Sequence, residues 1–141
     1  MSEKNVRLGF LGSPNSGKTT IFNALTGLRA KVGNYPGVTV ERREGKLRKS
    51  NKNITLIDLP GTYSLQPISS DEKVVSSLLT GRSEGNRVPD GLVLTVDACA
   101  IERSLLLVVQ ALRLDIPLCL TITMMDELKA RGGQILSLIH I

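Results

Sequence analysis

Residues 12–19 read Gly-Ser-Pro-Asn-Ser-Gly-Lys-Thr and carry the clearest chemical signal of the chain. Two glycines separated by four residues and followed by Lys-Thr form the pattern of a phosphate-binding loop. Gly12 and Gly17 permit backbone angles that turn successive N–H groups inward around a phosphate. We expect Lys18 to reach the β- and γ-phosphates of a nucleotide and the Thr19 hydroxyl to ligate Mg²⁺. A glycine-rich turn with a surface lysine is the alternative.

The segments on either side of the loop favour the phosphate-binding interpretation. Residues 6–11 alternate apolar with small or polar side chains, as a buried strand can, and residues 20–27 read as a short helix with a glycine stop. The positive end of the helix dipole would add to the attraction for a phosphate. The predicted nucleotide-binding set also includes Ser13, Asn15, Ser16 and Thr20.

Three positions downstream could complete a triphosphate site. Asp58 follows the apolar residues 54–57, and in phosphoryl-transfer proteins such an aspartate holds Mg²⁺, usually through water. Gly61 leaves a bare N–H that can approach the γ-phosphate. The Thr39 hydroxyl could close over Mg²⁺ and the γ-phosphate. A simple turn after Asp58 and a strand-start threonine at 39 are the alternatives, and spacing alone leaves the second one open.

A second carboxylate follows a later apolar run. Residues 123–126 read Thr-Met-Met-Asp. The Asp126 carboxylate could accept both the N1–H and the 2-amino group of guanine, which adenine does not offer in that arrangement. An aspartate that caps a helix is the alternative interpretation. Thr123 and Asp126 therefore join the predicted nucleotide-binding set.

The elements that must position these residues alternate between strands and helices. Residues 28–37 read as a loop, residues 38–47 as a polar edge strand, and residues 54–57 as a strand after a turn at 51–53. A helix is expected over 71–79, capped by Ser69 or Ser70 and ended by a glycine.

The second half of the chain continues the alternation. Residues 91–96 read as a buried strand and residues 118–122 as another. Between them an apolar helix face is predicted from Ile101, Leu105, Val108, Val109 and Leu112. The pattern predicts an α/β fold with a mostly parallel sheet covered by helices on both faces. Ligands of such sheets lie beyond the carboxyl ends of the strands, where the glycine loop falls.

Composition limits the function classes. The 141 residues are 41% apolar and 22% charged, as expected for one globular domain. With 3% aromatic residues and no Trp, the chain offers little surface for base stacking, so we expect no nucleic-acid partner. Much of the net charge of +5 lies in Arg42, Arg43, Lys46, Arg48, Lys49 and Lys52. This cluster is interpreted as a solvated hairpin face, with an anionic membrane surface or RNA as alternatives.

Cysteine usage and hydropathy point to a reducing compartment. Cys99 and Cys119 lie in apolar stretches without metal-ligand spacing, which predicts buried free thiols in a cytosol. The N-terminus is polar and runs directly into the first strand, so no signal peptide is expected. The sequence contains no stretch of 18 uninterrupted apolar residues, so no membrane span is expected either.

Taken together, these motifs resemble a known family. Residues 12–27 resemble the phosphate loop of small GTPases of the TrmE–Era–Obg–ferrous-iron-transporter group. Residues 34–41, Asn-Tyr-Pro-Gly-Val-Thr-Val-Glu, and residues 58–65, Asp-Leu-Pro-Gly-Thr-Tyr-Ser-Leu, narrow the resemblance. With residues 70–72, 96–98 and 102–103 they look like the cytosolic G domain of FeoB-type ferrous iron transport proteins, over about residues 6–135.

The resemblance implies a P-loop GTPase that binds GTP or GDP and Mg²⁺. It makes Thr39 and Asp58 the two switch anchors, and Lys18, Thr39 and Gly61 the catalytic groups. Asn15 matches a position that helps ligate K⁺ in potassium-stimulated members, where the ion could replace the charge of an arginine finger. Thr62 stands where many GTPases carry a water-positioning glutamine, so slow hydrolysis, faster in K⁺ than in Na⁺, is expected.

Two departures from the family pattern matter. The base-reading motif begins with Asn in the family but with Thr123 here, which keeps a hydroxyl for bracing the phosphate loop and loses an amide contact to guanine. Residues 136–141 are what a transposase adapter of sequencing libraries encodes. We interpret them as a read-through tail, give His140 no role, and expect residues 1–135 to be a G domain without its final strand and helix.

The resulting hypothesis is a regulatory GTPase domain of a bacterial Fe²⁺ transporter, on the cytoplasmic face of the inner membrane. Its partners would be a guanine nucleotide and the membrane permease part of the same natural polypeptide, with self-association into a homo-oligomer left open. The alternative is a soluble GTPase of ribosome or RNA maturation, whose phosphate loops look alike.

Overall fold

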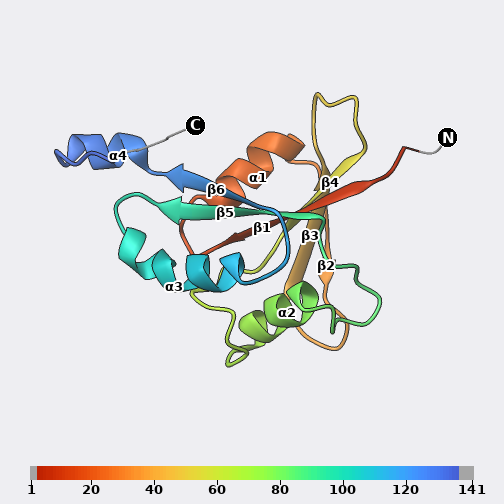
Figure 1. The fold of residues 1–141 in the computed structure, drawn as a ribbon. Coiled ribbons are helices and arrows are strands. Elements are labelled where there is room, and N and C mark those ends of the chain that lie inside the picture. Colours follow the sequence, from red (N-terminus) through yellow and green to blue (C-terminus); the bar gives the residue numbers. More distant parts are fainter. Residues whose placement is uncertain (1–2, 137–141) are drawn as a thin grey trace.

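The computed structural model describes residues 3–136, so the tail predicted over 136–141 lies outside the described residues except for Leu136. Within residues 3–136 one six-stranded sheet is flanked by helices (Figure 1). The strands are β1 (Val6–Gly12), β2 (Ala30–Asn34), β3 (Glu41–Lys46), β4 (Ile54–Asp58), β5 (Gly91–Asp97) and β6 (Leu118–Thr123). The helices are α1 (Lys18–Thr26), α2 (Ser70–Leu79), α3 (Ile101–Leu112) and α4 (Met125–Ala130).

The sheet is mixed, with order β2-β3-β4-β1-β5-β6. Strands β4, β1, β5 and β6 run parallel, whereas β3 is antiparallel to both β2 and β4. The carboxyl ends of β1 and β4 therefore open toward the same edge, where β1 leads into the glycine loop and α1. The predicted α/β fold with a mostly parallel sheet is confirmed.

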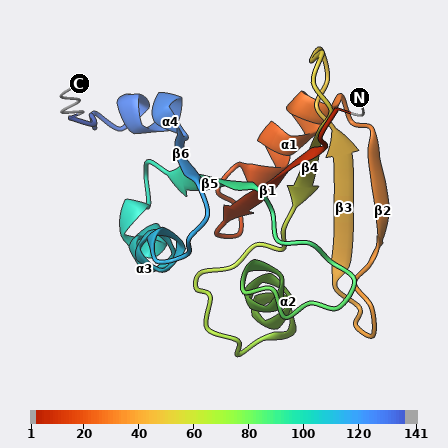
Figure 2. The same cartoon turned by 45° about the vertical axis from the view of Figure 1, so that its right-hand side comes forward.

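Neighbouring residues on each central strand serve two separate cores. Leu11 and Ile57 point to one face of the sheet and pack in a large cluster with side chains of α2 and α3. Phe10 and Leu56 point to the other face, where they pack with Phe22 of α1. This alternation is the period of a strand buried on both faces. Helices accordingly cover both sides of the sheet, with α1 opposite α2 and α3 (Figure 2).

The prediction for residues 28–47 was wrong in one respect. The segment expected to be a loop contains β2, which pairs antiparallel with β3 from Ala30↔Gly45 to Asn34↔Glu41. The edge strand is therefore β2, and β3 lies inside the sheet. Exposed edge strands need no apolar alternation, because backbone hydrogen bonds alone hold them. The turn-forming Gly33 and Asn34 consequently masked the strand in the sequence.

The predicted apolar face of α3 was also wrong. Ser104, Leu107 and Ala111 are the residues that the helix buries. Leu105 and Leu112 are 52% and 66% exposed, and among the five predicted residues only Val108 packs against the core. Small side chains at 104 and 111 let the helix approach β5 closely, an advantage that counting large apolar residues does not register.

The helix termini follow their sequence signals. Gly17, with a φ of 82°, precedes α1, and Gly27, with a φ of 63°, ends it; both are left-handed conformations that glycine adopts readily. Ser69 caps α2 through a capping box, in which its hydroxyl accepts from the Glu72 N–H and the Glu72 carboxylate accepts from the Ser69 N–H. Of the two predicted cap residues, Ser69 is therefore the correct one.

The thiols are less buried than predicted. Cys99 is half-buried and Cys119 is exposed on β6, although both are free. The expectation of two buried thiols was wrong: Cys119 is exposed because β6 lies at the edge of the described sheet, and Cys99 lies in the turn after β5 instead of inside a strand. No helix in the described residues is long and apolar enough to cross a membrane.

Candidate nucleotide-binding site

The glycine loop between β1 and α1 is shaped by close backbone approach. A Cβ at Gly12 would collide with the Thr95 hydroxyl and lie 2.8 Å from Ser16 Oγ, so only glycine fits. Gly17 adopts a left-handed conformation, and so does Asn15, with a φ of 62°. Asparagine tolerates this region better than most residues. These angles curve residues 12–17 around the start of α1, as a phosphate cradle requires.

Hydrogen bonds fix the loop to the strands beneath it. The hydroxyls of Ser16 and Thr95 lie 2.8 Å apart, and both side chains are buried. The Thr123 hydroxyl donates to the Ser16 carbonyl at 2.6 Å, which is the brace that the sequence suggested for this threonine. The Thr62 N–H donates to the Gly12 carbonyl at 3.0 Å. Contacts from β5, β6 and the segment after β4 therefore hold the loop in place.

A buried ion pair joins the loop to β4. The Lys18 ammonium contacts the Asp58 carboxylate, and both side chains are less than 10% exposed. The Thr19 hydroxyl donates to the other Asp58 oxygen at 3.3 Å. The three groups predicted to handle phosphate and Mg²⁺ thus lie together, with the cation and the carboxylate satisfying each other.

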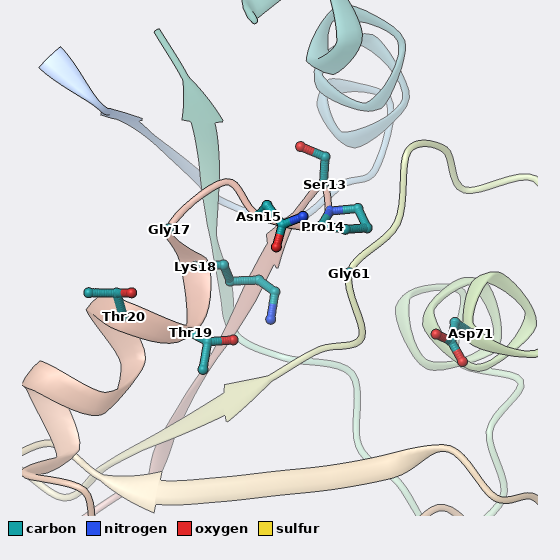
Figure 3. A pocket seen from close by; sticks show the side chains of 9 residues that line it. All are labelled: Ser13, Pro14, Asn15, Gly17, Lys18, Thr19, Thr20, Gly61 and Asp71. Atoms are coloured by element: carbon teal, nitrogen blue, oxygen red, sulfur yellow. The ribbon is translucent and has the colours of Figure 1, made fainter. Parts of the chain in front are cut away.

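Two adjoining hollows open beside this ion pair, and they share Lys18, Thr19, Gly61 and Asp71. The first has a volume of about 400 Å³ and is lined by Ser13, Pro14, Asn15, Gly17, Lys18, Thr19, Thr20, Gly61 and Asp71 (Figure 3). The second, of about 370 Å³, adds Thr39 and Asp58. Figure 3 shows Lys18 and Thr19 at the start of α1, facing Asp71 across the opening. Together the two hollows offer room for a phosphate chain.

Most predicted site residues converge here, but Asp126 does not. Gly12 and Ser16 are buried residues of the loop itself, and Thr123 braces the loop from below. Asp126 lies in the first turn of α4, is exposed, and lines neither hollow. Its role as a guanine acceptor therefore stays a prediction.

The structure adds residues that the sequence did not single out. Asp71, in the first turn of α2, lines both hollows, although residues 70–72 had served only the family resemblance. Thr95 supports the loop from inside β5, and its only sequence signal was a hydroxyl within a buried apolar run. Thr62, which the sequence had already singled out, is 2% exposed, and its hydroxyl has no hydrogen-bond partner among the described residues.

A charged network backs the strand next to the site. Glu44 of β3 accepts from Arg7 and from Arg42, each at 2.7 Å. Burial opposes the charge of Glu44, but these hydrogen bonds outweigh it and hold its pKa below the ordinary value. The Arg42 guanidinium lies 5.8 Å from the centre of the Tyr35 ring. Burial raises the pKa of Tyr35 to about 12.

The donor set fits Mg²⁺ rather than a metal caged by protein. Within residues 3–136 there is no cluster of three or more His, Cys, Asp or Glu side chains that could hold a metal. Mg²⁺ at nucleotide sites is bound by one or two protein oxygens plus phosphate oxygens and water. The Thr19 hydroxyl and the Asp58 carboxylate, which lie 3.3 Å apart, offer this minimal set.

Comparison with known proteins decides the family. The family described as "Ferrous iron transport protein B" matches residues 6–137. The chain belongs to this family. It is 47% identical over 128 residues to the Fe(2+) transporter FeoB of Salmonella typhimurium, and equally to that of Escherichia coli strain K12. The match covers 87% of this chain but 16% of each transporter, so the chain corresponds to a small part of those FeoB proteins.

Solved FeoB structures share the fold. An S. thermophilus NFeoB mutant bound to mGDP superposes with a TM-score of 0.83 at 40% identity, covering 93% of this chain and 48% of that one. The G domain of the T. maritima FeoB iron transporter gives 0.78 at 42% identity, covering 89% and 76%. The predicted membership in the FeoB G-domain family and the P-loop GTPase fold are confirmed. The alternative of a ribosome or RNA-maturation GTPase is not favoured.

Proposed function

We propose that the chain binds GTP and GDP, hydrolyses GTP slowly, and regulates the permease part of a bacterial Fe²⁺ transporter from the cytoplasmic face of the inner membrane. The observation that carries this proposal is the meeting of Lys18, Thr19 and Asp58 at the mouth of the glycine loop. Relatives of the same fold are described as bound to mGDP or GDP, which supports a guanine nucleotide as the ligand.

The site residues would act by positioning and charge rather than by covalent chemistry. Lys18 would exchange its contact with Asp58 for the β- and γ-phosphates, and Thr19 and Asp58 would hold Mg²⁺. Bound Mg²⁺ would neutralise charge on the phosphate oxygens. Thr39, which lines the second hollow, would close over the γ-phosphate, and the Gly61 N–H would approach it.

The position of Thr62 supports the proposal of slow hydrolysis. Its hydroxyl is buried away from solvent, so it does not reach a water in the hollow from this position. A water must then be oriented by backbone groups or by a neighbouring residue. Asn15, which lines the first hollow, would help to hold a K⁺ ion whose charge favours the transition state.

Guanine selectivity would depend on Asp126, with Thr123 supporting the phosphate loop instead of contacting the base. The Thr123 hydroxyl is engaged by the Ser16 and Val96 carbonyls, at 2.6 and 3.2 Å. We therefore expect GTP to be preferred over ATP with a lower affinity than in relatives that carry asparagine at this position.

The first test is single-turnover and steady-state GTP hydrolysis in K⁺ and in Na⁺ at equal ionic strength. We expect faster turnover in K⁺, and we expect Asn15→Ala to remove the difference while it leaves GDP binding measurable. Lys18→Ala should abolish nucleotide binding and serves as the negative control. Equal rates in the two salts would refute the potassium role, and ATP that competes as well as GDP would refute the guanine assignment.

A further inference from the structure

The end of the molecule opposite the glycine loop carries a concentration of positive charge. The β3–β4 hairpin, the loop from α1 to β2 and the start of β1 come together there (Figures 1 and 2). We call this region the basic end, and it is made of Arg29, Lys31, Lys46, Arg48, Lys49 and Lys52 together with Leu28. No part of the proposed nucleotide site uses these residues.

A hollow of about 750 Å³ lies in the basic end. Arg7, Arg29, Lys31, Lys46 and Arg48 contribute to its lining, with Glu44 as the one carboxylate. Glu44 is already engaged by Arg7 and Arg42, each at 2.7 Å. The hollow therefore presents uncompensated positive charge and suits an anionic partner.

Among the described residues, the cations of the basic end lack ion-pair partners, unlike the arginines nearby. Within residues 3–136, no ion pair engages Arg29, Lys31, Arg48, Lys49 or Lys52, whereas Arg42 and Arg43 pair with Glu44 and Glu41 of their own strand. Lys46 donates to the neutral groups of Asn53 and Thr55. The net charge of +5 is therefore not spread evenly but gathers at this end.

An apolar side chain stands among these cations. Leu28 is 78% exposed and lines the same hollow. Its backbone is left-handed, with a φ of 63°, and its N–H donates to the Asn23 carbonyl at 3.0 Å. Leucine rarely adopts this conformation, so the closing hydrogen bonds of α1 hold the side chain outward at some cost.

A leucine exposed among lysines and arginines matches the chemistry of a bilayer interface better than that of RNA. Basic side chains meet anionic headgroups, while an apolar side chain enters the region just below them. Binding of single-stranded RNA relies on exposed aromatic rings. The one exposed aromatic residue of the described part, Tyr63, follows Gly61 beside the nucleotide site instead.

We propose that the basic end docks on anionic phospholipid headgroups, with Leu28 inserted at the interface. This inference rests on the proposed function, which places the domain beside a membrane. Each lysine or arginine near an anionic surface adds about 1 kcal/mol, or about fivefold in affinity. The five unpaired cations are therefore enough for measurable, salt-sensitive binding.

The test is co-sedimentation of the full chain with vesicles of phosphatidylcholine alone or mixed with phosphatidylglycerol, at low and high salt. We expect the chain to bind only the vesicles that contain phosphatidylglycerol, and to lose this binding at high salt. The double variant Lys49→Glu/Lys52→Glu should bind at least about 25-fold more weakly, given about fivefold for each cation lost. Leu28→Ser should weaken binding to the mixed vesicles several-fold at low salt, the condition under which binding is expected.

The control is Arg103→Glu/Arg113→Glu, which makes the same change of net charge at exposed positions on α3 and at its C-terminal cap. This control variant should bind mixed vesicles far better than Lys49→Glu/Lys52→Glu does. Equal losses in the two double variants, no binding to mixed vesicles, or binding to RNA but not to vesicles would each overturn the proposal. GDP binding, measured on the same samples, separates failure of the docking inference from failure of the proposed nucleotide function.

Discussion

The hydroxyl of Thr123 lies where β6 meets the phosphate loop and ties two elements together. It donates to Ser16 of the loop and lies within hydrogen-bond distance of Val96 at the end of β5. Its methyl group also sits beneath Gly17, where a Cβ on that glycine would lie 3.6 Å from Thr123. The Thr123 side chain therefore supports the loop at both Ser16 and Gly17.

Substitution of Thr123 should separate bracing from base recognition. Thr123→Val keeps the shape but removes the donor, so GDP affinity should fall about threefold to tenfold, the worth of one hydrogen bond. Thr123→Asn restores an amide donor and should raise GDP affinity relative to ADP. Titration with fluorescent GDP, with ADP as competitor, measures both. Unchanged affinity in the valine variant would show that the brace does not support binding.

Tyr35 presents a buried hydroxyl without a hydrogen-bond partner among the described residues. The ring is 4% exposed, and burial raises the pKa to about 12 from 10.0. Because the folded-state pKa is the higher one, ionisation of Tyr35 does not lower stability below pH 10. Stability falls as the pH rises from 10 through 12, since the unfolded chain releases this proton more readily.

Tyr35→Phe should therefore leave stability at pH 7 unchanged or raise it by up to about 1 kcal/mol, since an unpaired polar group is removed. It should also abolish an absorbance step of tyrosinate near pH 12. Urea unfolding and spectrophotometric titration check the two outcomes, with Tyr63→Phe at the exposed tyrosine as the control. A clear destabilisation by the phenylalanine variant would mean that the hydroxyl has a partner.

At the scale of elements, α2 depends on its N-terminal cap. Ser69 and Glu72 satisfy each other's backbone N–H groups, and the first turn also carries Asp71, which faces the site. The cap thus holds in place both a helix and a carboxylate of the nucleotide pocket.

Ser69→Ala should destabilise the chain by about 1 kcal/mol, because the N-terminal N–H of Glu72 loses its acceptor. Ser70→Ala, one residue later, removes no capping hydrogen bond and should change stability by less than about 0.5 kcal/mol. Chemical denaturation of the two variants makes the comparison. Equal effects of the two substitutions would contradict the assignment of Ser69 as the cap.

Elements with strong local signals could be predicted from sequence, and elements held by their surroundings could not. Gly17, Gly27 and the Ser69–Glu72 pair mark the helix ends through local backbone chemistry, so α1 and α2 were foreseen. Strand β2 is held by pairing with β3, and the orientation of α3 by the small residues Ser104 and Ala111. Strand β2 leaves no periodic apolar pattern in the chain, and in α3 the large apolar residues indicate the wrong face.

The residues of the site also fall into those that local sequence signals predict and those that only the fold brings there. The spacing of Gly12, Lys18 and Thr19 is local, and Asp58 follows a recognisable strand, so their convergence was predictable. Asp71 and Thr95 enter the site only because the sheet order brings α2 and β5 beside the loop. Long-range placement of that kind has no signal at the residues themselves.

At the scale of the molecule, nucleotide binding and folding should be linked. The two hollows are lined by residues from the glycine loop, α1, β3, β4 and α2, so a ligand there joins elements from both faces of the sheet. GDP with Mg²⁺ at 100 times its dissociation constant should add about 2.7 kcal/mol of stability.

Thermal unfolding with and without GDP measures this linkage. ADP at the same concentration should shift the melting temperature far less. Lys18→Ala should remove the GDP-dependent shift of the melting temperature. A melting temperature that GDP leaves unchanged would mean that the chain does not bind nucleotide.

The exposed thiol of Cys119 gives the open edge of the sheet a chemical reporter. Strand β6 pairs with β5 on one side only within the described residues, and Cys119 is exposed whereas Cys99 is half-buried. A maleimide dye should therefore label Cys119 first. Any polypeptide that comes to lie against β6, whether a further segment or a second molecule, would slow that labelling. The labelling rate of Cys119 therefore reports whether this edge is covered.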